Sequence, residues 1–233
     1  MAIPTFLKPR MLLAAGAALA LSGCFGVPDV LKRGDGGEKV SSRPARPSSS
    51  DAPSFNSSSA RQCAVDLQQA GVRFTPLPDQ QHGGGCSSID SVKLLDIGTP
   101  VSGLGPMTCP LARNFAAWAQ HAVRPAARKF FGSEVVKIET FGTYSCRNIY
   151  GGRSGRLSQH AYSNAVDVAG FVLADGRRIM LKSGWNGDRS SQDFLRALHK
   201  SACRRFGTVL GPEYNAAHHD HFHFDMSGNG YCR

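Results

Sequence analysis

The sequence predicts an α+β fold for residues 61–233, with a small antiparallel sheet flanked by helices and held by disulfides. Two longer segments repeat apolar residues at helical spacing, and several shorter ones alternate apolar with polar residues as half-buried strands do. The expected helices are 112–131 and 191–206, and the expected strands are 135–141, 165–173, 178–182 and 219–225. Because helices and strands are grouped rather than alternating as βαβ units, antiparallel pairing is expected.

Each expected helix is identified by one apolar face. Phe115 and Trp118 lie about one turn apart in the first helix, and Leu195 and Leu198 do so in the second. Pro125 falls inside the first helical run. Since proline has no backbone N–H and its ring clashes with the preceding turn, we expect the helix to kink or divide there.

The longest expected strand has two different faces. Val166 and Val168 alternate with Asp167, so the valines point to one face of the sheet and the carboxylate to the other. An Asp-Gly pair at 175–176 is typical of a tight turn. The segment 178–182 is therefore expected to return as the hairpin partner of this strand.

The cysteines indicate an oxidising compartment. The chain has 7 cysteines. Apart from the one near the N-terminus they are Cys63, Cys86, Cys109, Cys146, Cys203 and Cys232. An even set favours three disulfides, whereas a cysteine zinc site usually needs a C-x-x-C spacing that is missing here. Of the 15 possible pairings, we expect Cys63–Cys86, Cys109–Cys146 and Cys203–Cys232.

The N-terminus has the pattern of a bacterial lipoprotein signal. A cationic stretch is followed by an apolar run too short to span a bilayer, which needs about 20 residues. The run ends in Leu21-Ser22-Gly23-Cys24, which is similar to a lipobox, so residues 1–23 are expected to be removed and Cys24 to be lipidated. The alternative is an ordinary signal peptide with a chance cysteine.

The residues after the lipidation site suggest where the protein works. Position 25 is Phe rather than Asp, which by resemblance to sorting rules favours an outer-membrane lipoprotein that faces the periplasm. Residues 24–60 are rich in Ser, Pro and Gly and cannot bury enough apolar surface to fold. They are expected to form a flexible tether with a reach of about 30–35 Å.

The net charge leaves several partners open. The formal charge is +10, and removal of the signal peptide deletes two positive charges and no negative one, which leaves +8. Anionic envelope polymers, lipid headgroups or simple solvation of a basic surface each fit an exported protein. Nucleic acid is not expected, because no arginine-rich run or recognition helix is present.

A cluster of histidines and aspartates carries most of the polar chemistry. Four of the 8 histidines lie between residues 218 and 223. On a strand, His221 and His223 would share a face, about 6.5–7 Å apart at Cα. If that strand pairs antiparallel with the one that holds Asp167, the carboxylate faces the histidines, and His160 can fold over the same place from the preceding loop.

These residue types suit zinc. Imidazole nitrogen and carboxylate oxygen bind zinc at about 2.0–2.2 Å, and a catalytic site leaves one position open. His160, Asp167 and one of the later histidines would supply three ligands to one Zn²⁺. The alternatives are hydrogen-bonded surface histidines that cluster by chance, or a zinc or copper buffer.

The spacing H-x6-D followed by H-x-H resembles the LAS metallopeptidases, the group of lysostaphin, the D-alanyl-D-alanine metallopeptidases and sonic hedgehog. More closely, residues 61–233 resemble the extensin-like C-terminal domain family of bacterial envelope proteins. The segments that carry this closer resemblance are 144–147, 157–161, 164–168 and 210–215. The resemblance implies His160, Asp167 and His223 as zinc ligands and His221 as a catalytic base.

The resemblance also bears on the neighbouring residues. The stretch from 218 to 223 is most similar to the penicillin-insensitive murein endopeptidase, where a further histidine lines the site, and His218 or His219 could match it. The D,D-peptidases suggest that Arg147 holds a substrate carboxylate or stabilises an oxyanion. A structural salt bridge explains Arg147 equally well.

The function expected from these observations is zinc-dependent hydrolysis of peptide bonds in peptidoglycan, of the endopeptidase or carboxypeptidase type. The partners would be the peptidoglycan peptide and, through Cys24, a membrane. The alternative is a non-catalytic module that keeps the metal site but only binds the cell wall or a partner.

Overall fold

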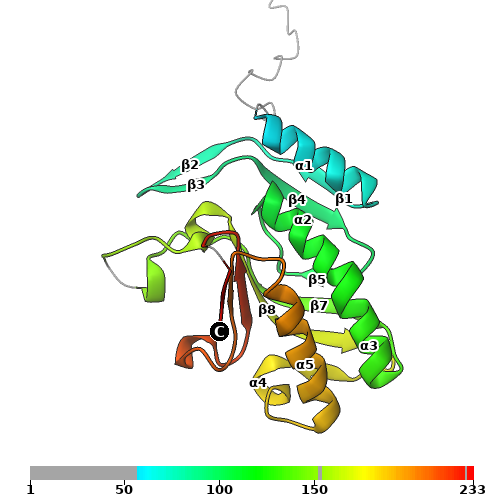
Figure 1. Ribbon diagram of the computed structural model, residues 1–233. Helices are drawn as coiled ribbons and strands as arrows, with labels where there is room; N and C mark the ends of the chain where they lie inside the picture. Colours follow the sequence, from blue (N-terminus) through cyan, green and yellow to red (C-terminus); the bar gives the residue numbers. More distant parts are fainter. Residues whose placement is uncertain (1–56, 152–153, 229) are drawn as a thin grey trace, which may run out of the picture. The chain divides into compact units, whose positions relative to one another are not determined.

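A mixed, largely antiparallel sheet with helices packed against one of its faces dominates the computed structural model (Figure 1). The structure describes residues 57–151, 154–228 and 230–233. The α+β prediction is therefore confirmed. The expected signal peptide, the lipidation site Cys24 and the expected tether up to residue 56 lie outside the described residues.

The main sheet has seven strands in the order β12-β10-β11-β8-β7-β5, with β9 paired to β8. They are β5 (Val101–Ser102), β7 (Val135–Gly142), β8 (Ala165–Leu173), β9 (Arg178–Met180), β10 (Thr208–Leu210), β11 (Phe222–Asp225) and β12 (Tyr231–Cys232). Pairing is antiparallel except between β10 and β12 and between β5 and β7, which run parallel.

The pairing of β8 with β11 agrees with the prediction from sequence. The two strands are antiparallel neighbours, with Asp167 opposite His223 and Val166 opposite Phe224. Val166 and Phe224 are buried in the core. Because side chains alternate along a strand, Asp167 and His223 emerge on the other face of the sheet.

The first helical run divides where proline predicts it. α2 (Cys109–Trp118) passes into a π-helical turn at Ala119–Val123 and then into α3 (Arg124–Phe131). Pro125 lies in the first turn of α3, where its missing N–H is tolerated. The wider π turn before it accommodates the lost hydrogen bond.

The second expected helix is displaced toward the N-terminus. α5 (Arg189–Ala202) begins two residues before the expected start, because the Asp188 side chain caps it by accepting a hydrogen bond from the Ser191 backbone N–H at 3.0 Å. It ends at Ala202, and the residues up to Phe206 form turns rather than helix.

Two expected strands are shorter than predicted. β9 stops at Met180, and the next residues form a short helix, α4 (Leu181–Gly184). β11 begins only at Phe222, after a 3-10 turn at Ala216–His218. His221 therefore lies just outside the strand that carries His223.

An aromatic cluster joins the helices to the sheet. The fully buried Trp118 of α2 makes an edge contact with Phe224 of β11, with ring centroids 5.0 Å apart. Its indole N–H donates to the backbone oxygen of Leu198 in α5 at 3.2 Å. Phe171 of β8 meets Phe194 of α5 in the same way, at 5.2 Å. Such contacts fix α2 and α5 to each other and to one face of the sheet.

The N-terminal part of the described chain contains elements that the sequence did not predict. They are α1 (Ser58–Gln69), a three-stranded sheet of β1 (Arg73–Pro76), β4 (Ser91–Asp96) and β6 (Met107–Thr108), and a hairpin of β2 (Gln80–Gly83) and β3 (Cys86–Ser88). α1 takes up the last residues assigned to the tether, because Ser57 accepts a hydrogen bond from the Ala60 N–H and caps the helix.

Three disulfides are present, but two of the expected pairings were wrong. The bridges join Cys63 to Cys109, Cys86 to Cys146 and Cys203 to Cys232, with Cα–Cα distances of 6.1, 5.7 and 5.6 Å. α1 packs against α2, which brings Cys63 of α1 to Cys109 at the start of α2. Cys86 of the β2–β3 hairpin is bonded instead to Cys146, in the loop after β7. Only the Cys203–Cys232 pairing is confirmed.

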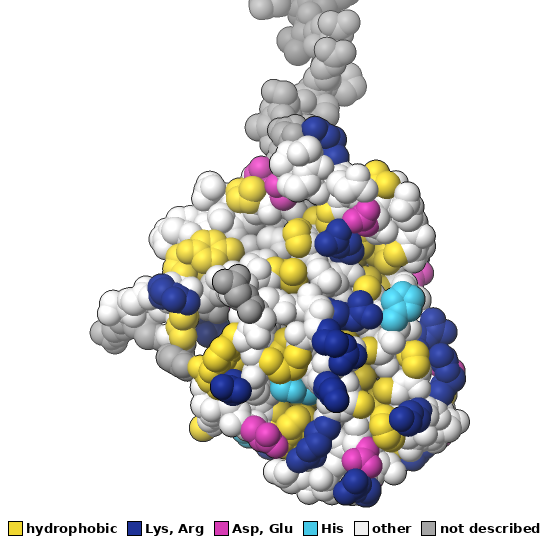
Figure 2. All heavy atoms as spheres, in the orientation of Figure 1, with side chains coloured by type: hydrophobic (Ala, Val, Ile, Leu, Met, Phe, Trp, Pro, Cys, Tyr) yellow, Lys and Arg dark blue, Asp and Glu magenta, His cyan; other side chains and the backbone are white. Residues whose placement is uncertain are grey.

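Basic side chains gather over the helical face of the domain, as Figure 2 shows in the orientation of Figure 1. α3 contributes Arg124, Arg128 and Lys129, and α5 contributes Arg189 and Lys200. Among the described residues, no helix combines the length and apolar character needed to cross a membrane.

Candidate metal centre

Three elements bring His160, Asp167 and His223 together. Asp167 and His223 come from the paired strands β8 and β11. His160 comes from a 3-10 turn at Gln159–Tyr162, which Ser158 caps and which a left-handed Ser163 (φ 53°) ends before β8 begins. All three side chains are buried. The sequence prediction that these residues meet across two antiparallel strands agrees with this arrangement.

The facing donor atoms lie at nearly equal distances. His160 Nε2 is 3.1 Å from Asp167 Oδ2 and 3.2 Å from His223 Nδ1, and His223 Nδ1 is 3.0 Å from Asp167 Oδ1. A tetrahedral ion with bonds of about 2.0–2.1 Å requires donors about 3.3 Å apart. The two imidazole nitrogens and the carboxylate therefore fit a small tetrahedral cation with little adjustment.

The outer ring nitrogen of each histidine has an oxygen partner of its own. His160 Nδ1 donates to the backbone oxygen of Thr143 at 3.2 Å, and His223 Nε2 donates to Asp225 Oδ2 at 2.9 Å. Since both acceptors are oxygens without a proton to give, the outer nitrogens carry protons, and each inner nitrogen can hold either a cation or a second proton that it shares with Asp167. Metal-binding histidines usually have such an outer hydrogen bond to a carbonyl or a carboxylate.

Asp225 is itself fixed in place. Its Oδ1 accepts hydrogen bonds from the backbone N–H of Ser227 at 2.7 Å and from the Ser227 hydroxyl at 2.6 Å. Its other oxygen remains directed at His223. The orientation of the His223 ring therefore follows from a chain of two contacts that starts in the loop after β11.

The electrostatics of the cluster favour a positive charge. Burial acts to raise the pKa of Asp167, but hydrogen bonds from His160 and His223 outweigh it and hold the pKa well below its usual range. Burial likewise acts to lower the pKa of His223, yet the carboxylates of Asp167 and Asp225 raise it to about 9. Two carboxylates thus stabilise a cation, either a proton or a metal ion, between them.

His221 lies beside the cluster with one ring nitrogen fixed. Its Nδ1 is 3.0 Å from Asp220 Oδ1, and its Nε2 is 3.6 Å from Asp167 Oδ1. In the neutral ring, Nδ1 donates a hydrogen bond to the Asp220 carboxylate, which leaves the Nε2 lone pair directed at the cluster. This is the arrangement expected of a general base that a carboxylate orients.

The structure distinguishes the two remaining histidines. His218 lines the pocket, with its ring 5.8 Å from that of His223 and 5.1 Å from that of His221. Burial and the charges of these two neighbours lower the pKa of His218 to about 4, so its ring is neutral at neutral pH. His219 has an exposed side chain, lies outside the pocket lining and contacts Asp220 from the other side, at 3.7 Å.

A pocket of about 330 Å³ opens over the cluster. Asp167, His221 and His223 form part of its lining. The lining also includes Arg147 and Arg156, which lie on two chain segments that pair through the isolated bridge Asn148–Leu157. The structure therefore brings Arg147 to the same pocket as the histidines.

Several residues of the site had not been assigned a role from the sequence. Asp225 lies two residues after His223 on the same strand, and this spacing is the signal that could have identified it. Asp220 is adjacent to His221 in the chain. The Thr143 contact uses a backbone oxygen, so no side-chain pattern could have revealed it.

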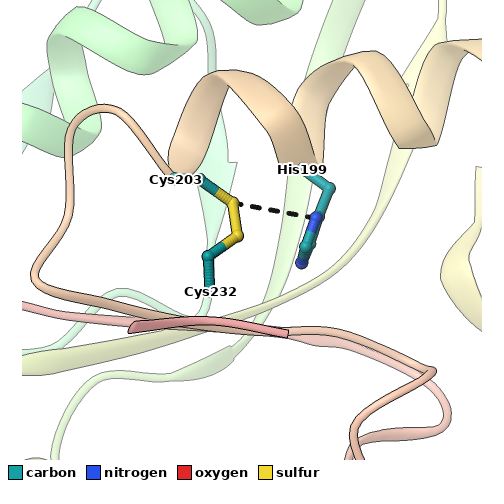
Figure 3. Close-up of side chains that lie close together, drawn as sticks. All are labelled: His199, Cys203 and Cys232. Carbon is teal, nitrogen blue, oxygen red and sulfur yellow. Dashed lines mark hydrogen bonds between the residues drawn. A yellow bond between two sulfur atoms is a disulfide. The ribbon is translucent and has the colours of Figure 1, made fainter. Parts of the chain in front are cut away.

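A second group of possible donors lies at the C-terminal end of α5 (Figure 3). His199, Cys203 and Cys232 have donor atoms within 4.8 Å of one another. The two sulfurs are bonded to each other. A metal would need free thiolates there, so His160, Asp167 and His223 form the candidate metal centre.

The fold and the site thus define an α+β domain with a buried two-histidine, one-aspartate cluster at the base of a pocket. The chain belongs to the extensin-like family, since the extensin-like protein C-terminus matches residues 61–233. No curated protein and no solved structure matches the chain.

Proposed function

We propose that this protein is a zinc-dependent hydrolase of peptide bonds in peptidoglycan, related to the LAS metallopeptidases and anchored in the bacterial envelope through Cys24. The observation that carries the proposal is the orientation of the two buried imidazoles. Each has its outer nitrogen bonded to a fixed oxygen and its inner nitrogen directed at Asp167. A cluster that only stabilised the fold would not need both inner nitrogens to converge on one carboxylate.

The chemistry follows from the donor set. A zinc ion bound by two imidazoles and one carboxylate would polarise a carbonyl and acidify a water molecule. His221 Nε2, 3.6 Å from Asp167 Oδ1, would act as the general base and then as the acid for the leaving amine, while Asp220 holds its tautomer. The neutral ring of His218 lies on the same side of the pocket, where it can bind a polar group of the substrate.

The pocket fits a peptide with an anionic group. Arg147, which lines the same pocket, can hold a substrate carboxylate or stabilise an oxyanion. Peptidoglycan stem peptides carry free carboxylates. In this proposal, the lipid anchor and the tether of residues 24–60 keep the domain within reach of the wall on the periplasmic side of the outer membrane.

Isolated murein sacculi test the proposal directly. The mature protein is incubated with sacculi, with and without a zinc chelator, and the released muropeptides are resolved by chromatography. We expect cleavage that the chelator abolishes and zinc restores. Binding to sacculi without any cleavage would instead support the non-catalytic module, and metal uptake without binding or cleavage would support a metal buffer.

A further inference from the structure

The Cys203–Cys232 disulfide has an imidazole directly against one of its sulfurs (Figure 3). His199 Nδ1 lies 3.8 Å from Cys203 Sγ, and His199 Nε2 lies 3.1 Å from the backbone oxygen of Arg233. A backbone oxygen only accepts, so Nε2 carries the proton of the neutral ring. Nδ1 therefore presents its lone pair to the sulfur.

The imidazole is held in this position by packing. Its ring lies 5.9 Å from that of Trp185 and 5.5 Å from that of Phe222. A Cβ at Gly211 would lie 3.1 Å from the ring, so glycine there allows the close approach. Burial lowers the pKa of His199, which keeps the ring neutral and the lone pair available at neutral pH.

Both cysteines of this disulfide, Cys203 and Cys232, are partly exposed. In the other two bridges of the described chain, Cys63 and Cys109 are both buried, and Cys86 is buried although its partner Cys146 is exposed. Thiol–disulfide exchange requires a thiolate to reach one sulfur of the bond. Both sulfurs of this bridge belong to cysteines that solvent reaches.

The chain around the two cysteines is cationic. Arg204 and Arg205 follow Cys203, and Arg233 follows Cys232. Positive side chains stabilise a cysteine thiolate and attract an anionic reactant. They add to the effect of the ring, which stabilises the departing thiolate once Nδ1 carries the proton that the incoming thiol has lost.

We propose that Cys203–Cys232 is a thiol-exchange site served by His199, and that its reactant is a small anionic thiol. The incoming thiolate attacks Cys232 Sγ and forms a new S–S bond there. The Cys203–Cys232 bond breaks, its electron pair goes to Cys203 Sγ, and His199 Nδ1 relays to that sulfur the proton that the incoming thiol has lost. A second thiol then attacks the small-thiol sulfur of the mixed disulfide, which releases Cys232 as a thiol and the small thiol as its oxidised dimer.

The position of the bridge connects this chemistry to the pocket. Cys232 ends β12, and β12 pairs with β10 through only two residue pairs, Thr208 with Tyr231 and Val209 with Cys232. Tyr231 lines the pocket. Opening the bridge therefore releases the covalent tie between α5 and a strand that forms part of the pocket wall.

Native-state reduction tests the proposal. The disulfide-bonded mature protein is incubated with reduced glutathione, free thiols are alkylated at intervals, and mass spectrometry quantifies each bridge. We expect Cys203–Cys232 to open first. His199→Gln should slow its opening at least about tenfold, a conservative part of the about 10²–10⁴-fold that a positioned acid–base group contributes. The exposed His121, replaced by Gln, serves as the matched control and should leave the rate unchanged.

The other two bridges report in the same samples whether the fold is intact. If His199→Gln accelerates all three, the fold has loosened. His199→Phe, which keeps a ring between Trp185 and Phe222 but removes both nitrogens, then decides. An unchanged or faster opening of Cys203–Cys232 in a folded variant overturns the proposal.

The charge of the thiol tests the class of reactant. At equal thiolate concentrations, anionic glutathione should react faster than neutral mercaptoethanol, and cationic cysteamine should react most slowly. Salt should reduce these differences, because it screens exposed charges. Equal rates for the three thiols would overturn the assignment to an anionic reactant.

Discussion

At the scale of single residues, the candidate metal ligands are one set of residues and the groups that orient them are another. His160, Asp167 and His223 direct their donor atoms at one point, while Thr143 and Asp225 bind the outer nitrogens. Residue types and strand alternation predicted His160, Asp167 and one of the later histidines, and the family resemblance indicated His223. The contact at Thr143 uses a backbone oxygen, which no residue pattern specifies, whereas the spacing of Asp225 from His223 was a signal that went unused.

Metal content distinguishes a ligand from a base. Replacing a ligand leaves two protein donors, too few to hold zinc tightly, whereas replacing the base leaves three. We expect His160→Ala, Asp167→Ala and His223→Ala to lose zinc on dialysis. His221→Ala should keep close to one zinc per chain but lose activity on sacculi by about 10²–10⁴-fold. Elemental analysis of the dialysed variants is the measurement.

The reverse result is equally informative. If His221→Ala lost the metal and His223→Ala kept it, His221 and not His223 would be the third ligand. If all four variants kept the metal, the site would lie elsewhere in the chain.

Asp225, the carboxylate that orients His223, should affect the zinc affinity of the site rather than the number of zinc ions that it binds. Asp225→Asn keeps the shape of the side chain but removes its charge and weakens the contact at His223 Nε2. Loss of such an outer partner typically lowers metal affinity about 10–100-fold. Competition titration with a fluorescent zinc chelator should show this decrease at one site per chain. An unchanged dissociation constant would mean that the orientation of the ring does not depend on Asp225.

At the scale of helices and strands, sequence patterns predicted the elements with strong periodicity and missed the rest. β8 was predicted with its observed bounds, and the first helical run divided near Pro125. The strands before residue 109 were missed, because several are only two to four residues long and β2 is exposed throughout. The neighbouring strands determine where a short exposed strand forms, so its own sequence shows little apolar periodicity.

The strand that carries His223 should also be critical for stability. Phe224 is fully buried against Trp118 and Phe206, with ring centroids 5.0 and 4.7 Å apart. Phe224→Ala should lower the free energy of unfolding by about 3–5 kcal/mol, through lost burial and the cavity that remains. Urea denaturation followed by circular dichroism measures this.

Phe141 provides the matched control. It is the same residue type, lies in the neighbouring part of the sheet and is 62% exposed. Phe141→Ala should therefore change stability by no more than about 0.5 kcal/mol. Equal losses in the two variants would mean that the aromatic cluster does not hold β11 against the helices.

At the scale of the whole molecule, the distribution of covalent links shows where sequence reasoning stops. That the six cysteines of residues 61–233 form three disulfides could be predicted from their even number and from the missing C-x-x-C spacing. Their pairing could not, because Cys63 meets Cys109 only when α1 packs against α2. Such contacts join segments 46 residues apart, and local patterns contain no information about them.

The expected lipidation site, Cys24, lies before the described domain in the sequence, and this leads to a prediction about the anchor. None of the three disulfides uses Cys24, and the described domain begins at residue 57 with its own capped helix. If Cys24 is the lipidation site, Cys24→Ala should abolish palmitate labelling and release the protein from the outer-membrane fraction, because stable anchoring needs at least two acyl chains. The released protein should still form all three disulfides and bind one zinc, since the described residues supply all six bridged cysteines and the candidate metal centre. Equal labelling of the variant would exclude Cys24 as the acylated residue, and loss of the disulfides would show that export, and not only anchoring, requires it.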